Sequence, residues 1–274
     1  MDVVAIIPAY NEARTITAVV KAVRPHVDAV LVIDDGSADD TSRLAIAAGA
    51  QVHRHHRNLG KASAIATGFR QAAGLNPRWI ITLDGDGQHP ATRLPAMIQL
   101  ARKHPEDVII GARMLDREQA PALRRFANGF ADFWVSWAAG TPYRDTQSGL
   151  RLYPARVAAS LPPPSRPEHG FAYESEILIE LGQRRHGVIH HPIETLYPEN
   201  RRPSHYQAWK DTGSIVKMVA ARLLRRGLSP RALLHSLDSR RLCVLPAGEY
   251  GEQTTDPLTE TPAGPLAGTS GTEK

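Results

Sequence analysis

The sequence has almost no cysteine and no long apolar run. Its one cysteine among 274 residues, Cys243, excludes a disulfide framework within the chain and is typical of a reducing compartment. No window approaches the roughly 18 or more apolar residues that a membrane-crossing helix needs. Residues 1–8 lack the basic start and the longer apolar stretch of a secretory signal. The sequence therefore predicts a cytoplasmic protein, either soluble or peripheral on the inner face of the cell membrane.

The absence of two kinds of motif argues against two classes of function. The first apolar segment is not followed by G-x-G-x-x-G, which disfavours a nucleotide-dependent dehydrogenase. No motif of a nucleic-acid-binding fold is present, and no basic stripe alternates with stacking aromatics, so we expect no nucleic-acid partner. The formal charge of +5 is unevenly spread, because residues 247–274 hold five acidic residues and one lysine, which leaves about +9 on residues 1–246. A basic body fits an anionic membrane surface or a phosphate-rich substrate.

Apolar segments alternate with helical patterns through the first half of the chain. The expected strands are residues 3–7, 29–33, 79–83 and 108–110, with a short one beginning at Val52. The expected helices between them are residues 12–23, 39–48, 61–74 and 90–103. Strands separated by helices of this length predict an α/β fold with a mostly parallel sheet flanked by helices.

The second half is less regular. It predicts helices at residues 124–139, 173–184 and 207–226, and a strand at residues 187–191. The aromatic face of the first of these helices is expected to be core rather than a lipid groove; it consists of Phe126, Phe130, Phe133, Trp134 and Trp137.

Composition divides the chain into three parts. We expect an α/β domain over residues 1–206, a basic helical extension over 207–246 and a disordered acidic tail over 247–274. The extension has two possible roles, as an anchor on anionic lipid or as a helix packed on the domain with a solvated basic face.

Polar side chains follow several of the predicted strands directly. The clearest run is Asp84-Gly85-Asp86-Gly87-Gln88-His89. Ligands bind at the carboxyl edge of an open α/β sheet, where these residues would gather. Two carboxylates one glycine apart suit Mg²⁺ or Mn²⁺, which also take substrate phosphates as ligands. The alternative is a turn whose aspartates cap the next helix.

Two further motifs are weaker when taken alone. The carboxylates of Asp34-Asp35-Gly36-Ser37 could accept hydrogen bonds from a base or ribose, or the segment could be an ordinary Asp-Gly turn. The segment Pro8-Ala9-Tyr10-Asn11-Glu12 could hold a base or ribose, or could simply be a strand exit and helix cap.

Together with Asn58-Leu59-Gly60-Lys61, these motifs in this order resemble the family-two inverting glycosyltransferases of GT-A fold. The resemblance covers roughly residues 3–205 and is strongest to the branch with dolichyl-phosphate mannosyltransferase and bacterial polyprenyl-phosphate glycosyltransferases. It implies a Rossmann-like sheet, a UDP- or GDP-linked sugar donor, a Mg²⁺ or Mn²⁺ ion and a lipid-phosphate acceptor. Many bacterial relatives have C-terminal transmembrane helices, which this sequence does not show.

The resemblance also implies roles for individual residues. The expected nucleotide-sugar contacts are Pro8, Tyr10, Glu12, Asp34, Asp35, Lys61 and Asp84. The expected metal ligands are Asp84, Asp86 and Gln88. The expected contacts of the acceptor phosphate are Arg113, Ser148 and Arg125.

Two alternatives remain open at this point. If the acceptor were a neutral hydroxyl of a glycan or another lipid, it would need a carboxylate base, for which Asp145 is the candidate. A non-catalytic relative that only binds nucleotide is the other, although Asp84, Asp86 and Gln88 are all present. Glu174 and Glu176 match an acidic helix position of the branch, and either could have a site role or a structural one.

Overall fold

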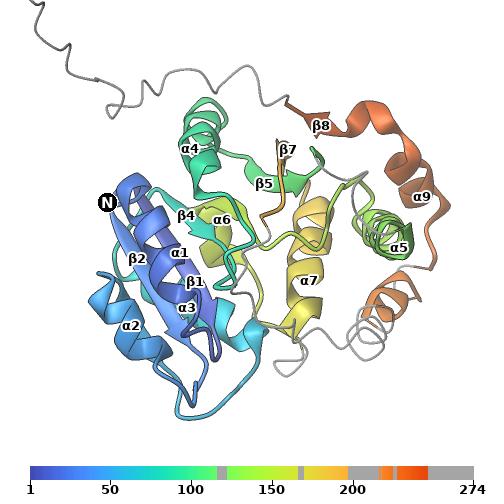
Figure 1. Ribbon diagram of the computed structural model, residues 1–274. Helices are drawn as coiled ribbons and strands as arrows, with labels where there is room; N and C mark the ends of the chain where they lie inside the picture. The colour runs from blue at the N-terminus through green and yellow to red at the C-terminus, as the bar shows by residue number, and fades with distance from the viewer. Residues whose placement is uncertain (116–121, 166–169, 197–215, 217, 225–226, 246–274) are drawn as a thin grey trace, which may run out of the picture.

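A computed structural model describes residues 1–115, 122–165, 170–196, 216, 218–224 and 227–245. In these parts of the chain, eight strands form a single sheet in the order β3-β2-β1-β4-β6-β5-β7-β8 (Figure 1). The strands are β1 (Val3–Ala9), β2 (Ala29–Asp34), β3 (Gln51–Arg54), β4 (Trp79–Thr82), β5 (Val108–Arg113), β6 (Arg151–Pro154), β7 (Val188–Ile193) and β8 (Cys243–Val244).

Helices cover both faces of this sheet. They are α1 (Ile16–Val23), α2 (Thr41–Ala47), α3 (Lys61–Ala73), α4 (Leu94–Lys103), α5 (Ala122–Ala139), α6 (Ala155–Ser160), α7 (Gly170–Gln183) and α9 (Pro230–Leu237). Short 3-10 turns span Arg24–His26, Ala91–Arg93 and Ser239–Arg241. Helices α1, α2 and α4 pack on one face, and α3, α5, α6 and α7 pack on the other.

Side chains of β1 enter the two cores alternately. Val4 and Ile6 pack under α3, whereas Ala5 and Ile7 pack under α1. A strand buried on both faces reads as a continuous apolar run, and this pattern made the central strands predictable.

The sheet is parallel except at β6, which confirms the predicted mostly parallel α/β fold. Strand β6 is antiparallel to both β4 and β5. It was not predicted, because Arg151-Leu152-Tyr153-Pro154 is short and begins and ends in residues unusual for a central strand. Because β6 runs antiparallel to β4, the segment just before β6 lies at the carboxyl edge of the parallel strands.

The C-terminal described residues pack on the same body. Strand β8 pairs with β7, with His190 opposite Val244. Helix α9 lies against α5, where Nε1 of Trp137 donates to the carbonyl of Ser229 at 3.3 Å. Residues 216 and 218–224 of the predicted helix 207–226 are helical, and the predicted tail lies outside the described residues.

The aromatic face of α5 corrects one expectation. Phe126, Phe130 and Phe133 are 73%, 43% and 37% exposed, so the prediction that they are core is wrong. The other two aromatics of this face, Trp134 and Trp137, are partly buried and pack against the core. The helix instead buries Val135 and Ala138 on its opposite side, and α9 covers only the C-terminal end of the aromatic stripe. Among the described helices, none has both the length and the apolar character needed to cross a membrane.

Candidate active site

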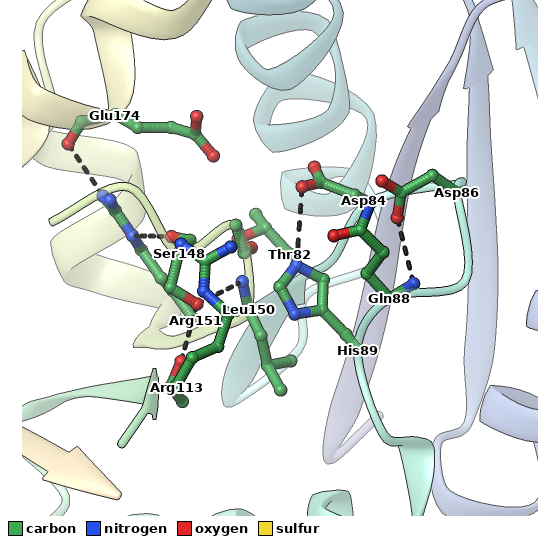
Figure 2. Close-up of polar contacts among 12 residues, drawn as sticks. Thr82, Asp84, Asp86, Gln88, His89, Arg113, Ser148, Leu150, Arg151 and Glu174 are labelled. Carbon is green, nitrogen blue, oxygen red and sulfur yellow. Dashed lines mark hydrogen bonds and ion pairs between the residues drawn. The ribbon is translucent and has the colours of Figure 1, made fainter. Parts of the chain in front are cut away.

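The loop after β4 brings two carboxylates to the carboxyl edge of the sheet. Asp84 and Asp86 stand two residues apart in this loop (Figure 2). The backbone of Gly149 lies directly against Asp84, because a Cβ at this glycine would come within 2.6 Å of Oδ2. The loop before β6 and the loop after β4 therefore meet at this carboxylate.

Two basic side chains contact Asp84. Its Oδ1 lies 2.6 Å from Nζ of Lys61, and its Oδ2 lies 3.4 Å from Nε2 of His89. Burial tends to raise the pKa of Asp84, but the positive charge of Lys61 outweighs it and holds the pKa well below its usual range. Burial by itself would lower the pKa of the Lys61 ammonium, but the negative charges of Asp84 and Glu174 raise it. Asp84 and Lys61 therefore form a buried ion pair.

Asp86 has no such cation among the contacts that the structure gives it. Its Oδ1 accepts the backbone N–H of Gln88 at 3.0 Å. Burial, and next the charge of Asp84, raise the pKa of Asp86. Two carboxylates that repel each other in a buried loop are a place where a divalent cation is stabilising.

The predicted metal ligands are these two carboxylates and the amide of Gln88. In the described parts of the chain, no group of three or more His, Cys, Asp or Glu residues could hold an ion. Mg²⁺ keeps several waters and is commonly bound through one or two carboxylates plus substrate phosphates. Asp84, Asp86 and Gln88 fit such an incomplete shell, which a diphosphate would complete.

The end of β1 lies beside the carboxylate loop. A Cβ on Gly85 would come 3.3 Å from the carbonyl oxygen of Pro8 and 3.5 Å from Cγ of Glu12. The hydroxyl of Thr15 donates to the carbonyl of Gly85 at 2.7 Å. Tyr10 is half-buried in the same turn. The structure thus brings Pro8 and Glu12 to the loop, with Tyr10 between them in the chain, and contact of the three residues with a nucleotide sugar stays a prediction.

Asp34 and Asp35 are both buried and accept hydrogen bonds from the protein. Asp34 accepts the N–H of Ser37 at 2.8 Å. Asp35 accepts the N–H of Gly60 at 2.8 Å and lies 2.7 Å from Nδ1 of His55. Asp35 fixes the loop that precedes Lys61, whereas Asp34 fixes the turn after β2. A direct contact of either carboxylate with a nucleotide stays a prediction.

The opposite side of the site contains an arginine clamped by a carboxylate. Nε and Nη2 of Arg113 donate to the two carboxylate oxygens of Asp145 at 2.9 and 2.6 Å. Burial alone would lower the pKa of Arg113, but Asp145 raises it above its ordinary value. Asp145 has a positive φ of 51°, and its backbone N–H is held by Asp132 of α5 at 3.1 Å.

Ser148 and Arg125 occupy different positions relative to this arginine. Ser148 is fully buried, and its hydroxyl donates to the carbonyl of Gly111 at 2.6 Å. Arg125 is exposed near the start of α5. It lies two turns before Asp132, whose position on the helix faces the Asp145 loop. Contact of either residue with an acceptor stays a prediction.

Arg151 is the functional-site residue whose role the sequence did not reveal. It is fully buried, and its guanidinium donates to the carbonyls of Ser148 and Glu174 at 2.9 and 2.8 Å (Figure 2). It also donates to the carbonyl of Thr146 at 2.9 Å. One side chain thus fixes the loop before β6 and the start of α7. Nothing in the sequence marked this arginine as buried, since arginine is mostly exposed in proteins.

Comparison with solved structures shows the class of fold. Glucosyl-3-phosphoglycerate synthase of Mycobacterium tuberculosis, crystallised with Mn²⁺, UDP and glucosyl-3-phosphoglycerate, superposes with a TM-score of 0.57 at 22% identity. The match covers 84% of this chain and 81% of that one. The chain therefore has the GT-A fold of nucleotide-sugar-dependent glycosyltransferases.

Sequence comparison then gives the family. The model of glycosyl transferase family 2 matches residues 4–148, and the chain belongs to that family. UDP-N-acetylglucosamine–dolichyl-phosphate N-acetylglucosaminyltransferase of Methanococcus voltae is 27% identical over 217 residues, which are 71% of this chain and 85% of the relative. Undecaprenyl-phosphate mannosyltransferase of Micrococcus luteus is 25% identical over 242 residues, which are 84% of this chain and 96% of the relative.

Proposed function

We propose that this glycosyltransferase moves a sugar from a UDP- or GDP-linked donor to a polyprenyl phosphate, with inversion and with Mg²⁺ or Mn²⁺. The observation that carries the proposal is the clamp between Arg113 and Asp145. The two relatives that use dolichyl or undecaprenyl phosphate by name support the same choice of acceptor.

The clamp argues against a hydroxyl acceptor. A hydroxyl would need Asp145 as its base, but both oxygens of this carboxylate accept hydrogen bonds from Arg113. Although burial works in the opposite direction, the guanidinium keeps the pKa of Asp145 below its ordinary value, which makes it a poor proton acceptor at neutral pH. A phosphate acceptor is already an anion and needs no base.

The reaction then requires no proton transfer. An oxygen of the acceptor phosphate attacks the anomeric carbon, and the bond from that carbon to the nucleoside diphosphate breaks as the diphosphate leaves with the electron pair. The ion, when bound by Asp84, Asp86 and Gln88, would stabilise charge on the departing diphosphate. Arg113 would hold the attacking phosphate; its pair with Asp145 uses Nε and Nη2 and leaves the Nη1 hydrogens outside the pair.

The surface of the molecule supports a lipid acceptor as well. The exposed aromatics of α5 belong to the helix whose Asp132 holds the loop of Asp145. On α9 and the 3-10 turn after it, apolar and basic side chains are exposed together; they are Leu234, Leu237, Arg231, Arg240 and Arg241. Aromatic and leucine side chains beside arginines are typical of a surface that lies on anionic lipid. We therefore infer peripheral binding to the cytoplasmic face of a membrane.

An acceptor and donor panel tests the proposal. UDP- and GDP-sugars are offered with Mn²⁺ or Mg²⁺, polyprenyl phosphate and dephosphorylated polyprenol. We expect transfer to the phosphate alone. Arg113→Ala should lower kcat/KM for polyprenyl phosphate about 100-fold through loss of charge-assisted phosphate binding, while donor Kd changes less than about twofold.

The matched control is Arg70→Ala, which removes an arginine from the exposed face of α3. Transfer to polyprenol, or loss of donor binding in Arg113→Ala, would contradict the proposed acceptor assignment.

A further inference from the structure

Lys61 is a buried ammonium between two carboxylates from distant parts of the chain. Its Nζ lies 2.6 Å from Oδ1 of Asp84 and 3.2 Å from Oε1 of Glu174. Asp84 belongs to the loop after β4, and Glu174 belongs to α7. The side chains of all three residues are mostly shielded from solvent, so their charges act on one another with little screening.

The backbone of Glu174 is fixed independently of Lys61. Its carbonyl accepts a hydrogen bond from Nη1 of Arg151 at 2.8 Å. The same guanidinium holds the carbonyls of Thr146 and Ser148. The carboxylate of Glu174 therefore projects from an anchored backbone position, and the position of Lys61 relative to Asp84 is defined by contacts on both sides.

The ammonium of Lys61 neutralises one of the two loop carboxylates and leaves the other charged. Asp84 is neutralised by an ammonium in contact with it, whereas Asp86 has only the N–H of Gln88 among its described contacts. A divalent ion that binds to both carboxylates must therefore tolerate a positive charge beside it. That charge is in turn offset by Glu174.

We propose that Lys61 and Glu174 are positioning residues that set the divalent-ion affinity of the Asp84–Asp86 loop in opposite directions. The inference rests on the proposed metal site. Lys61 weakens binding of the ion to the empty enzyme, and Glu174 limits this effect by holding and neutralising the ammonium. The ion then binds well only together with a diphosphate, whose negative charge the ammonium also attracts.

An electrostatic role and a purely structural role of this ion pair predict different directions for the change in the Kd of the divalent ion. Loss of packing or of fold would weaken ion binding in variants of either residue. An electrostatic role instead makes removal of the ammonium strengthen ion binding and removal of the carboxylate weaken it.

The experiment is a Mn²⁺ titration of the full chain without donor or acceptor, with free Mn²⁺ followed by electron paramagnetic resonance. For Lys61→Met we expect the Kd to fall at least about tenfold, because a unit charge a few ångströms from a divalent ion repels it by about this factor or more even at the dielectric constant of water. For Glu174→Gln we expect it to rise about threefold. Lys61→Arg retains the charge and should stay within about twofold of wild type.

Matched controls come from the same two helices. Arg70→Met removes a cation from α3, and Glu180→Gln neutralises a carboxylate on α7 that pairs with Arg184. Both should leave the Kd unchanged. Thermal unfolding reports whether each variant folds; if Lys61→Met does not fold, Lys61→Gln, which also removes the ammonium, takes its place in the comparison with Glu174→Gln.

The outcomes separate this inference from the proposed function. Kd changes of the same direction in Lys61→Met and Glu174→Gln, or no change in either, would overturn the inference. A wild-type enzyme that binds no Mn²⁺ even after UDP or GDP is added would overturn both the metal assignment and the inference. If the two Kd values change in the predicted opposite directions but no sugar is transferred to polyprenyl phosphate, the inference is supported and the proposed acceptor is wrong.

Discussion

At the scale of single residues, the tightest packing in the site is between Gly149 and the carboxylate of Asp84. Any side chain at residue 149 would overlap the carboxylate, since the added Cβ would lie 2.6 to 2.8 Å from its three terminal atoms. The glycine therefore sets how closely the loop before β6 approaches the loop after β4.

We expect Gly149→Ala to reduce turnover about 100-fold and to destabilise the fold by about 1–3 kcal/mol, because the added methyl group displaces Asp84 from Lys61. Steady-state kinetics with a saturating donor and urea unfolding measure the two effects. Gly74→Ala is the control, since that glycine ends α3 at a φ of −64°, which alanine adopts readily. Equal activity of the two variants would contradict the role assigned to this contact.

Residue types and spacing predicted the donor side of the site better than its supporting contacts. Asp84, Asp86 and Gln88 follow a strongly apolar strand, so their place at the sheet edge could be inferred from sequence alone. The engagement of Asp145 by Arg113 could not, because it depends on a positive φ and on the position of Asp132. The buried position of Arg151 also gave no sequence signal, since arginine is rarely fully buried.

At the scale of elements, β7 joins the catalytic sheet to the C-terminal strand through a buried histidine. Nδ1 of His190 lies 3.2 Å from the carbonyl of Cys243, and its Nε2 accepts the N–H of Arg144 at 3.2 Å. Burial lowers the pKa of His190 to about 4, so the ring is neutral in the folded protein. In the unfolded chain it gains a proton near pH 6.5.

This difference makes stability depend on pH with a defined sign. Between pH 6.5 and pH 4 the unfolded chain binds more protons at His190 than the folded one, so the stability contribution present above pH 6.5 is lost as the pH falls. We expect a loss of about 2 kcal/mol from this residue between pH 7 and pH 5.

His190→Gln should remove this part of the pH dependence, whatever its effect at pH 7. Urea unfolding at pH 7 and pH 5 measures how much the free energy of unfolding changes with pH. His56→Gln is the control, because that residue is exposed after β3. A variant with the wild-type slope would show that His190 is not the group responsible.

Long apolar elements were predictable, and short ones were not. Strands β1, β2, β4 and β5 are buried on both faces and read as apolar runs, so both their existence and their order along the chain were clear. Strands β6 and β8 have four and two residues and gain their structure from pairing with neighbours distant in sequence. Pairing of this kind leaves little local pattern to read.

At the scale of the whole molecule, the exposed apolar surface is concentrated on one side. Phe126, Phe130 and Phe133 lie along α5, and Leu234 and Leu237 lie on α9, which packs on the same helix. Helix α2 lies on the opposite side of the molecule (Figure 1). A membrane bound by α5 and α9 would therefore be near the side of the sheet that carries Arg113.

We expect the wild-type chain to bind vesicles of phosphatidylglycerol at low salt, and Phe126→Ser combined with Phe130→Ser to lower the partition coefficient at least about tenfold, because two apolar side chains no longer insert. Vesicle flotation measures the effect. Ile46→Ser removes an exposed apolar side chain from α2 and is the control. Equal binding of all three proteins, or no binding by wild type, would exclude this surface as a membrane contact.

The reversed direction of β6 has a consequence for how specificity is arranged along the chain. Residues before β5 supply the groups predicted to face the donor, and β5 and the residues after it supply Arg113 and the segment held by Arg151. Within the site, the two stretches meet where Asp84 contacts Gly149 and where Lys61 contacts Glu174. Exchange of residues 108–196 between relatives should transfer the choice of acceptor and keep the choice of nucleotide, provided that these two junctions come from compatible parents.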